Sequence, residues 1–339
     1  MDEASDKNGI MAALAAHPFR PARWLPGPHA QTVWGPLVRK RFGAALRRER
    51  WDTPDGDFLD ILFSDGRPGA PVVLLLHGLE GTPASFYIPA FARRFRGEGW
   101  TLAAMMFRSC GGDMNRARRL YHLGETEDPA WAAARLAARY PGSPLFAAGI
   151  SLGANALLKW LGEGSPVPAS LRGAAAISPP FDPARNAPRL EAALGGFYVR
   201  HFLRTLIPKA LEKERLHPGA LDAEAVRRCR TFYDFDTVAT ARLHGFADAE
   251  DYWRRCGCGQ FLGGVRVPTL LLCARDDPFM DPEALPSAAA EASPWLYPLF
   301  PERGGHVGFV SGPPWRPRHW AEEQTARFFR LLAGRNRGA

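Results

Sequence analysis

Cysteine is scarce in this chain, and its positions argue against both disulfides and a metal site. Five cysteines among 339 residues are too few for a disulfide framework in a chain of this length. The pair in "CGCG" at 256–259 lacks a second Cys/His pair at ligand spacing, so it is weak support for zinc. We therefore expect no metal ion. The cysteines are Cys110, Cys229, Cys256, Cys258 and Cys273.

Long apolar runs and a secretory leader are also lacking. No run reaches the roughly 18 residues that a membrane-spanning helix requires. The first residues, "MDEASDKNGIMAALAAHPF", begin acidic and contain only about six consecutive apolar residues, which is a poor secretory signal. With 46% hydrophobic and 23% charged residues, the composition is that of an ordinary globular protein. We expect a cytoplasmic protein.

Acidic residues are fewer than basic ones, 35 against 43, which gives a formal net charge of +8. The densest basic runs are "VRKRFGAALRRER" at 38–50 and "RARR" at 116–119. Neither is interleaved with aromatic residues, as a channel for single-stranded nucleic acid would be. We expect no nucleic-acid partner, although weak attraction to an anionic membrane surface stays open. The sequence does not indicate an oligomeric state.

Short apolar runs alternate with helical patterns along the chain, which predicts a mostly parallel sheet flanked by helices. The more apolar runs suit strands buried on both faces, whereas "GDFLDILFS" alternates and suits a place near a sheet edge. One predicted helix has Asp128 as its N-cap and Pro129 at its first position. Predicted strands cover 56–64, 71–78, 100–107, 144–150, 172–178, 268–274 and 295–300; predicted helices cover 88–95, 129–140, 154–161 and 322–332.

About 90 residues separate two of the predicted strands, too many for a simple crossover. This segment, 179–265, is helix-prone, aromatic and rich in arginine, so it predicts a helical cap over the carboxyl edge of the sheet, where ligands bind in open α/β sheets. The rest of the chain is expected to form two parts. These are an N-terminal extension at 1–50, packed on the core, and an α/β core at 51–178 and 266–335.

The stretch "FAAGISLGANALLKW" contains the pattern G-x-S-x-G between a predicted strand and a predicted helix. That context favours a nucleophile elbow, a turn so tight that the neighbours of the serine cannot carry bulk. Ser151 would then be exposed at the N-terminus of a helix, where the helix dipole favours developing negative charge. The alternative is a plain turn that needs glycine.

A serine nucleophile needs a base, and the base needs an orienting acid. "LLLCARDDPFMDP" places Asp276 and Asp277 directly after a late strand, and we favour Asp277 because of the spacing of the prolines that follow it. "LFPERGGHVGFV" places His306 after the final strand, with two glycines before it. The later His319 is interpreted as structural.

Two backbone N–H groups must stabilise the oxyanion of the tetrahedral intermediate. Leu152, which follows the nucleophile, is expected to supply one. Leu79, in "VVLLLHGLEG", is expected to supply the other, with Gly78 permitting the turn. His77 is interpreted as a brace for this loop rather than as a catalytic base.

Several long segments in order, from about residue 21 to 310, resemble the YheT-like branch of the α/β hydrolases. The resemblance implies an α/β-hydrolase fold and carboxylic-ester hydrolase activity, with Ser151 as nucleophile, Asp277 as acid and His306 as base. One departure is Trp253, where the family is expected to have tyrosine. The segments are "RWLPGPHAQTVWGPLVRK", "HGLEGTPASFYI", "MFRSCGGDMNRARRLYHLGETED", "ISLGANALLKWLGE" and "DDPFM…GGHVGFV".

The third of these segments follows a strand at the catalytic edge, so its polar residues Arg108, Asn115 and His122 could face the pocket. They could equally pin the loop by hydrogen bonds. We favour the pinning role and leave them out of the catalytic set.

The sequence thus predicts a cytoplasmic serine esterase with a helical cap, which forms an acyl-enzyme on a small-molecule ester or lipid with a short to medium acyl chain and needs no cofactor. One alternative keeps the same residues but transfers the acyl group to an alcohol. A second is a binding protein that retains the fold without catalysis, which the intact set of catalytic residues disfavours. A dehalogenase is disfavoured because its elbow would carry aspartate in place of Ser151.

Overall fold

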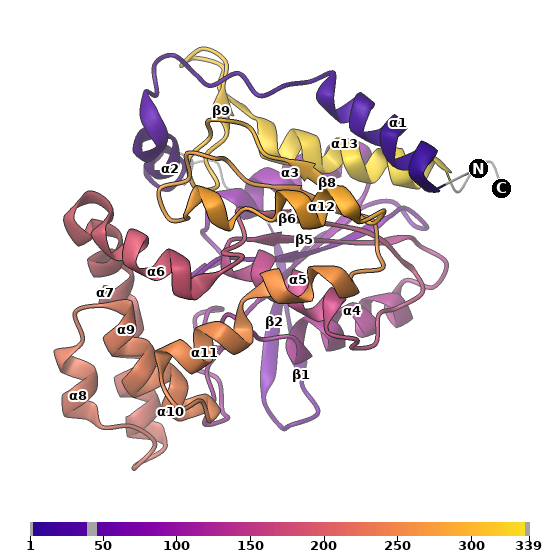
Figure 1. Ribbon diagram of the computed structural model, residues 1–339. Helices are drawn as coiled ribbons and strands as arrows, with labels where there is room; N and C mark the ends of the chain where they lie inside the picture. The colour runs from indigo at the N-terminus through magenta and orange to yellow at the C-terminus, as the bar shows by residue number, and fades with distance from the viewer. Residues whose placement is uncertain (1–2, 39–45, 336–339) are drawn as a thin grey trace.

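An eight-stranded sheet forms the centre of the molecule (Figure 1), in the computed structural model that describes residues 3–38 and 46–335. Its strands are β1 (Arg47–Asp52), β2 (Phe58–Ser64), β3 (Val72–Leu76), β4 (Thr101–Met106), β5 (Leu145–Ile150), β6 (Leu171–Ile177), β7 (Thr269–Leu272) and β8 (Leu296–Leu299). The order across the sheet is β1-β2-β4-β3-β5-β6-β7-β8. β1 and β2 are antiparallel to their neighbours, and every pair from β4 to β8 is parallel. The predicted mostly parallel sheet is confirmed.

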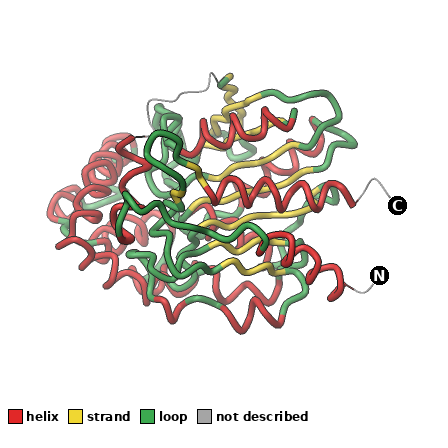
Figure 2. Tube along the Cα trace, turned by 90° about the horizontal axis from the view of Figure 1, so that it is seen from above, coloured by secondary structure: helices red, strands yellow, loops and turns green. Residues whose placement is uncertain are grey.

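Helices cover both faces of this sheet. One face is covered by α1 (Glu3–Ala15), α3 (Tyr87–Glu98) and α13 (Trp320–Arg335), and the other by α4 (Glu127–Arg139), α5 (Leu152–Gly162) and α12 (Ser287–Ala292). Figure 2 shows α1 and α13 lying side by side across the strands. On that face the ring of Phe146 stacks on Trp100 and Phe329, with centroid distances of 5.5 and 4.7 Å. These contacts bind α13 to the middle of the sheet.

The chain between β6 and β7 is mainly helical and lies beside the carboxyl ends of the strands (Figure 1). Its helices are α6 (Pro183–Ala192), α7 (Phe197–Leu216), α8 (Ala223–Arg228), α9 (Phe232–Phe235), α10 (Ala241–His244) and α11 (Ala249–Cys256). We use "the cap" for these residues, 183–256. The domain boundaries given above remain a prediction.

The sheet has one strand more than the sequence patterns indicated. β1 begins within the segment expected to be an extension, and its sequence RRERWD has no apolar alternation; only Trp51 is buried. It pairs along its whole length with β2, so β2 is the second strand from the edge, and β2 is buried at every position. An edge strand needs few apolar residues because one of its sides faces water, which explains why the pattern did not reveal it.

The start of α4 also differs from the expectation. The helix begins at Glu127 and its N-cap position is Thr126, so Asp128 lies inside the first turn. The carboxylate of Asp128 instead accepts two hydrogen bonds from the guanidinium of Arg108, at 2.8 and 2.7 Å. A cap needs a side chain that bends back to its own helix, and this carboxylate is already used elsewhere.

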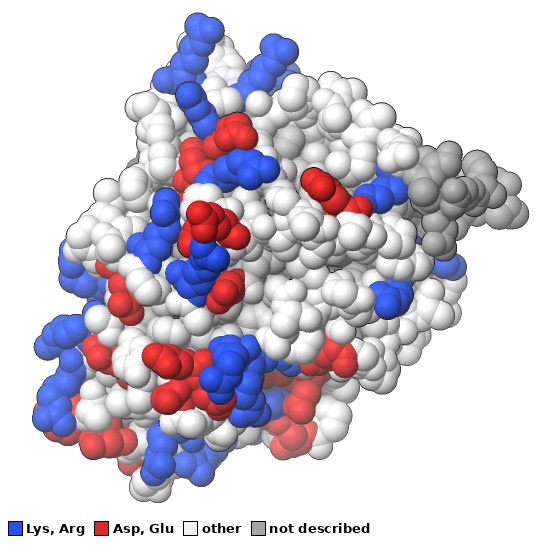
Figure 3. Space-filling view, in the orientation of Figure 1, with Lys and Arg blue, Asp and Glu red and all other residues white. Residues whose placement is uncertain are grey.

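The surface charges are mixed in sign on the face shown in Figure 3. Acidic and basic side chains lie interspersed in the lower part of the view, where α8, α10 and α11 lie. Residues 39–45 of the basic run at 38–50 lie outside the described residues, so attraction to an anionic membrane stays a prediction. None of the helices within 3–38 and 46–335 has the length and apolarity needed to cross a membrane.

Candidate active site

Ser151 lies on the sharp turn that joins β5 to α5. Its backbone has a φ of 52° and a ψ of −115°, a positive φ that residues other than glycine rarely adopt. The glycines on either side permit close approach of other backbone: a Cβ on Gly149 would lie 2.5 Å from Cα of Ala154, and one on Gly153 would lie 2.4 Å from the carbonyl oxygen of His77. The strain of the turn is therefore carried by the serine itself.

The three side chains singled out for catalysis form a continuous chain of hydrogen bonds. Nε2 of His306 lies 2.8 Å from Oγ of Ser151, and its Nδ1 lies 2.8 Å from Oδ2 of Asp277. Asp277 is fully buried, and its Oδ1 accepts a hydrogen bond from the backbone N–H of Phe279. In such a chain the imidazole can accept the serine proton while the carboxylate stabilises the resulting imidazolium.

Asp276, the alternative acid, has a different partner. Its Oδ1 accepts a hydrogen bond from the backbone N–H of Gly305 at 2.9 Å, beside His306 in the chain. Burial raises the pKa of Asp276 above its ordinary value. The structure thus brings Asp277 to the imidazole and uses Asp276 to hold the loop on which the imidazole lies.

The loop around His306 rests on α2 (Gly27–Val38), a contact that the sequence patterns did not predict. Oγ1 of Thr32 accepts the backbone N–H of His306 at 2.9 Å and donates to the carbonyl of Pro28 at 2.8 Å. The side-chain amide of Gln31 both donates to and accepts from the backbone of Val310, at 3.2 and 2.7 Å. The signal for these residues was the segment "RWLPGPHAQTVWGPLVRK", but a motif alone does not reveal which segment it contacts.

We expect Thr32→Val to lower kcat about 10-fold and to leave KM within about twofold, because a buried N–H that loses its acceptor pulls the His306 loop out of position. Steady-state hydrolysis of p-nitrophenyl butyrate measures both constants. Thr32→Ser keeps the hydroxyl and is the matched control, with kcat close to wild type. Equal kcat values for the Val and Ser variants would contradict a positioning role.

The residues of the two proposed oxyanion donors, Leu79 and Leu152, line the same cavity as Ser151. Leu152 is the first residue of α5, where an N–H has no intrahelical acceptor, and within the described chain neither its N–H nor that of Leu79 donates to a protein acceptor. A turn begins at Gly78, whose carbonyl accepts the N–H of Gly81 at 3.0 Å, and a Cβ at this position would lie 3.3 Å from Cβ of Ser151. Gly78 therefore lies close to the nucleophile, and the positive φ of the loop, 53°, belongs to Glu80.

Two further histidines, His77 and His319, make contacts that suit a structural role. Nε2 of His77 accepts the backbone N–H of Phe107 at 3.0 Å, so Nδ1 carries the proton and donates to the carbonyl of Gly78 at 2.7 Å. Burial lowers the pKa of His77 to about 4, which keeps it neutral at pH 7. His319 lies on the short strand β10 (Arg318–His319), where its ring packs on Trp34 at 5.6 Å.

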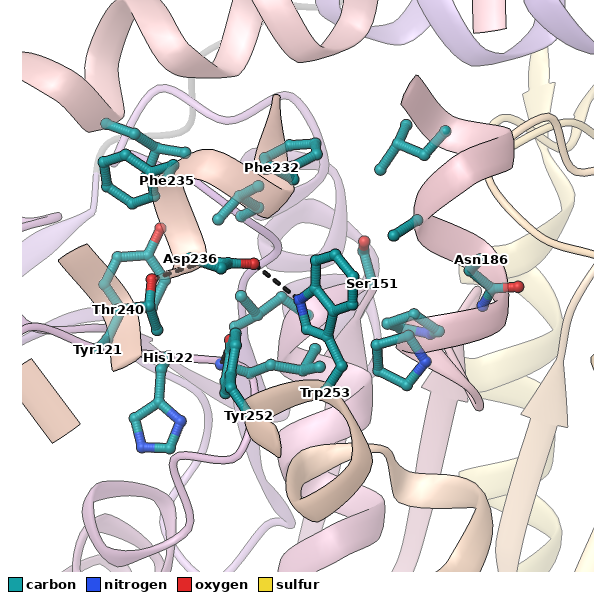
Figure 4. A pocket seen from close by; sticks show the side chains of 18 of the residues that line it. Tyr121, His122, Ser151, Asn186, Phe232, Phe235, Asp236, Thr240, Tyr252 and Trp253 are labelled. Atoms are coloured by element: carbon teal, nitrogen blue, oxygen red, sulfur yellow. Dashed lines mark hydrogen bonds between the residues drawn. The ribbon is translucent and has the colours of Figure 1, made fainter. Parts of the chain in front are cut away.

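A cavity of about 160 Å³, partly open to solvent, contains Ser151 and His306 and is lined by both the core and the cap. Its polar side, seen in Figure 4, centres on Asp236, whose carboxylate accepts hydrogen bonds from Trp253 Nε1 at 2.8 Å and Thr240 Oγ1 at 2.7 Å. Burial raises the pKa of Asp236 to about 6. Trp253, which stands where the family is expected to have tyrosine, thus supplies an N–H donor to the buried carboxylate of Asp236. Much of the remaining wall is apolar, including Leu120, Leu190, Leu206, Phe232, Phe235 and Met280.

The three polar residues of the segment after β4 all make contacts that hold this loop. Arg108 is 2% exposed and forms ion pairs with Asp57 and Asp128, at 2.8 and 2.7 Å. Asn115 donates from Nδ2 to Asp57 at 2.6 Å. These two residues therefore pin the loop. His122 pins the loop as well, because its Nδ1 accepts the backbone N–H of Gly124 at 3.1 Å, and its side chain also lies on the wall of the cavity.

The cysteines lie in the interior as free thiols. Burial raises the pKa of Cys256 to about 12, so this thiol is protonated at pH 7. Within 3–38 and 46–335, no three His, Cys, Asp or Glu side chains are grouped so that they could hold a metal ion.

Comparisons with known proteins agree with this fold and show the family of the chain. Residues 71–313 match the family described as "alpha/beta hydrolase fold". The Escherichia coli protein named "Putative esterase YheT" is 36% identical over 90% of this chain and 91% of its own length, and mouse phospholipase ABHD3 is 28% identical over 87% and 74%. The solved structure of the Pyrococcus furiosus esterase Pf2001 has a TM-score of 0.57 at 17% identity over 88% of this chain and 94% of that chain, which supports the fold alone. The chain therefore belongs to the α/β-hydrolase family, in its YheT-like branch, and is a hydrolase of the esterase and lipase type.

Proposed function

We propose that this protein is a serine carboxylic-ester hydrolase that acts through an acyl-enzyme, with Ser151 as nucleophile, His306 as base and Asp277 as orienting acid. The observation that carries the proposal is the pair of 2.8 Å hydrogen bonds that join these three side chains. The positive φ of Ser151 supports it, because strain of this kind is typical of nucleophile elbows.

In the first half of the reaction, Oγ of Ser151 attacks the ester carbonyl while Nε2 of His306 takes its proton. The backbone N–H groups of Leu79 and Leu152 hold the oxyanion, and His306 then returns the proton to the leaving alcohol. In the second half, a water molecule gives a proton to the same imidazole and attacks the acyl-enzyme. The bond between the acyl carbon and Oγ of Ser151 then breaks, His306 returns the proton to Oγ, and the acid is released.

The substrate that fits the cavity is an ester with an apolar acyl chain, of short to medium length, or a lipid. The largely apolar wall around Ser151 supports this choice, because burial of methylene groups contributes about 0.8 kcal/mol each. The similar proteins named phospholipase and, in yeast, monoacylglycerol lipase agree with a lipid-like substrate. A location in the cytoplasm is part of the same proposal.

Labelling by a fluorophosphonate probe tests the activated serine directly. We expect the wild-type protein to be labelled, and both Ser151→Ala and His306→Ala to lose labelling by about 10³-fold or more, because the first removes the attacking oxygen and the second its base. His319→Ala is the matched control and should be labelled at the wild-type rate. A folded wild-type protein that neither reacts with the probe nor hydrolyses p-nitrophenyl esters from acetate to laurate would contradict the proposal.

A further inference from the structure

An ion pair joins the cap to the loop that carries Leu79. Lys209, on α7, places its Nζ 2.5 Å from Oε1 of Glu80, the residue after Leu79. The two side chains are only 12% and 9% exposed, and Lys209 also lines the cavity that contains Ser151. Exposed ion pairs contribute little, but a shielded pair is a firm tether because neither charge can readily exchange its partner for water.

Glu80 is held a second time, by the hydroxyl of Tyr121. The backbone N–H of Glu80 donates to this oxygen at 2.7 Å, and the hydroxyl donates to Oε1 of Glu80 at 2.9 Å. The ammonium of Lys209 lies 5.4 Å from the centre of the Tyr121 ring. Glu80 therefore has both its backbone and its side chain fixed.

Glu80 needs these contacts because its backbone has a φ of 53°. A non-glycine residue keeps that conformation only where its surroundings hold it. The opposite end of the loop is already anchored, since the N–H of Gly78 donates to the hydroxyl of Tyr87 at 3.0 Å. The contacts of Glu80 thus fix the end of the loop that faces the cap.

We propose that Lys209 is a positioning residue for the oxyanion hole, which acts through Glu80 to fix the N–H of Leu79. The inference rests on the proposed ester hydrolysis and deepens it, because it makes the cap a part of the catalytic apparatus as well as a wall of the pocket. Oxyanion donors act over a narrow range of distances, about 2.7–3.1 Å, so a small movement of the loop lowers the rate of acylation.

The test compares kcat and KM for p-nitrophenyl butyrate, whose short chain makes KM insensitive to the far wall of the cavity. Lys209→Met keeps the apolar stem and removes the tether, so we expect kcat to fall about 10- to 30-fold with KM within about twofold. Lys209→Arg keeps a donor and should retain at least about a third of wild-type kcat. Arg215→Met, on the exposed side of the same helix, removes an ion pair with Glu212 and should leave kcat unchanged.

Lys209→Met also leaves the carboxylate of Glu80 without its counter-ion, and the double variant Lys209→Met with Glu80→Gln removes that charge. Positioning by the tether requires the double variant to remain at least about 10-fold below wild type. Recovery to the wild-type kcat would overturn the inference, because charge compensation alone would then be the role of Lys209. A single variant with wild-type kcat would also overturn it while leaving ester hydrolysis intact. Absence of hydrolysis in the wild type would instead overturn the proposed function.

Discussion

Asp277→Asn is expected to lower kcat for ester hydrolysis by about 10⁴-fold while the protein stays folded. The asparagine amide can donate a hydrogen bond to Nδ1 of His306, which favours the tautomer with its proton on Nε2 and removes the base that Ser151 needs. The carboxylate that stabilises the imidazolium is lost as well. Rates of p-nitrophenyl butyrate hydrolysis, measured beside the melting temperature, separate this effect from unfolding.

Asp276→Asn is the matched control, since it makes the same chemical change at the neighbouring position. An asparagine oxygen can still accept the N–H of Gly305 at 2.9 Å, so we expect kcat within about threefold of wild type. The assignment of the acid would be wrong if the larger loss occurred in Asp276→Asn. Similar losses in both variants would also contradict it, because the two carboxylates would then act as one unit.

The sequence allowed most of the sheet and the three aligned side chains to be predicted, for a physical reason. Buried parallel strands are continuous apolar runs. Ser151, Asp277 and His306 come one, five and seven residues after the ends of β5, β7 and β8. The carboxyl ends of parallel strands meet at one edge of the sheet, so the order of strands brings these residues together. β1 did not follow this rule, because a strand at the edge of the sheet can be largely polar.

The supporting contacts could not be predicted because they depend on pairing between distant parts of the chain. Thr32 and His306 are separated by 274 positions, and Glu80 and Lys209 by 129. Each of these residues is ordinary in its local sequence, and nothing in a helical or strand pattern indicates its partner. Asp128 illustrates the reverse error: its local sequence fits a helix cap, but Arg108, 20 positions earlier, binds its carboxylate.

Gly153→Ala adds only one methyl group. We nevertheless expect it to destabilise the fold by about 3 kcal/mol or more, or to prevent accumulation of folded protein. The new Cβ would lie 2.4 Å from the carbonyl oxygen of His77 and 2.6 Å from that of Leu76. Both oxygens belong to the backbone at the end of β3, so relief of the clash must separate α5 from β3. That movement would displace Ser151 from the loop that carries Leu79, and activity would fall with stability. Urea unfolding midpoints and the yield of folded protein measure the effect.

The matched control for this change is Gly97→Ala, since Gly97 also lies inside a helix, α3. A Cβ at Gly97 meets nothing within 4 Å, so the only effect is the better helix propensity of alanine, up to about 1 kcal/mol in favour of the folded state. Gly153→Ala gains the same propensity and should still lose stability, because contact with fixed backbone outweighs a local preference. If both variants were as stable as wild type, α5 and β3 could not be as close as the elbow requires, and glycine at 153 would serve only the flexibility of the turn.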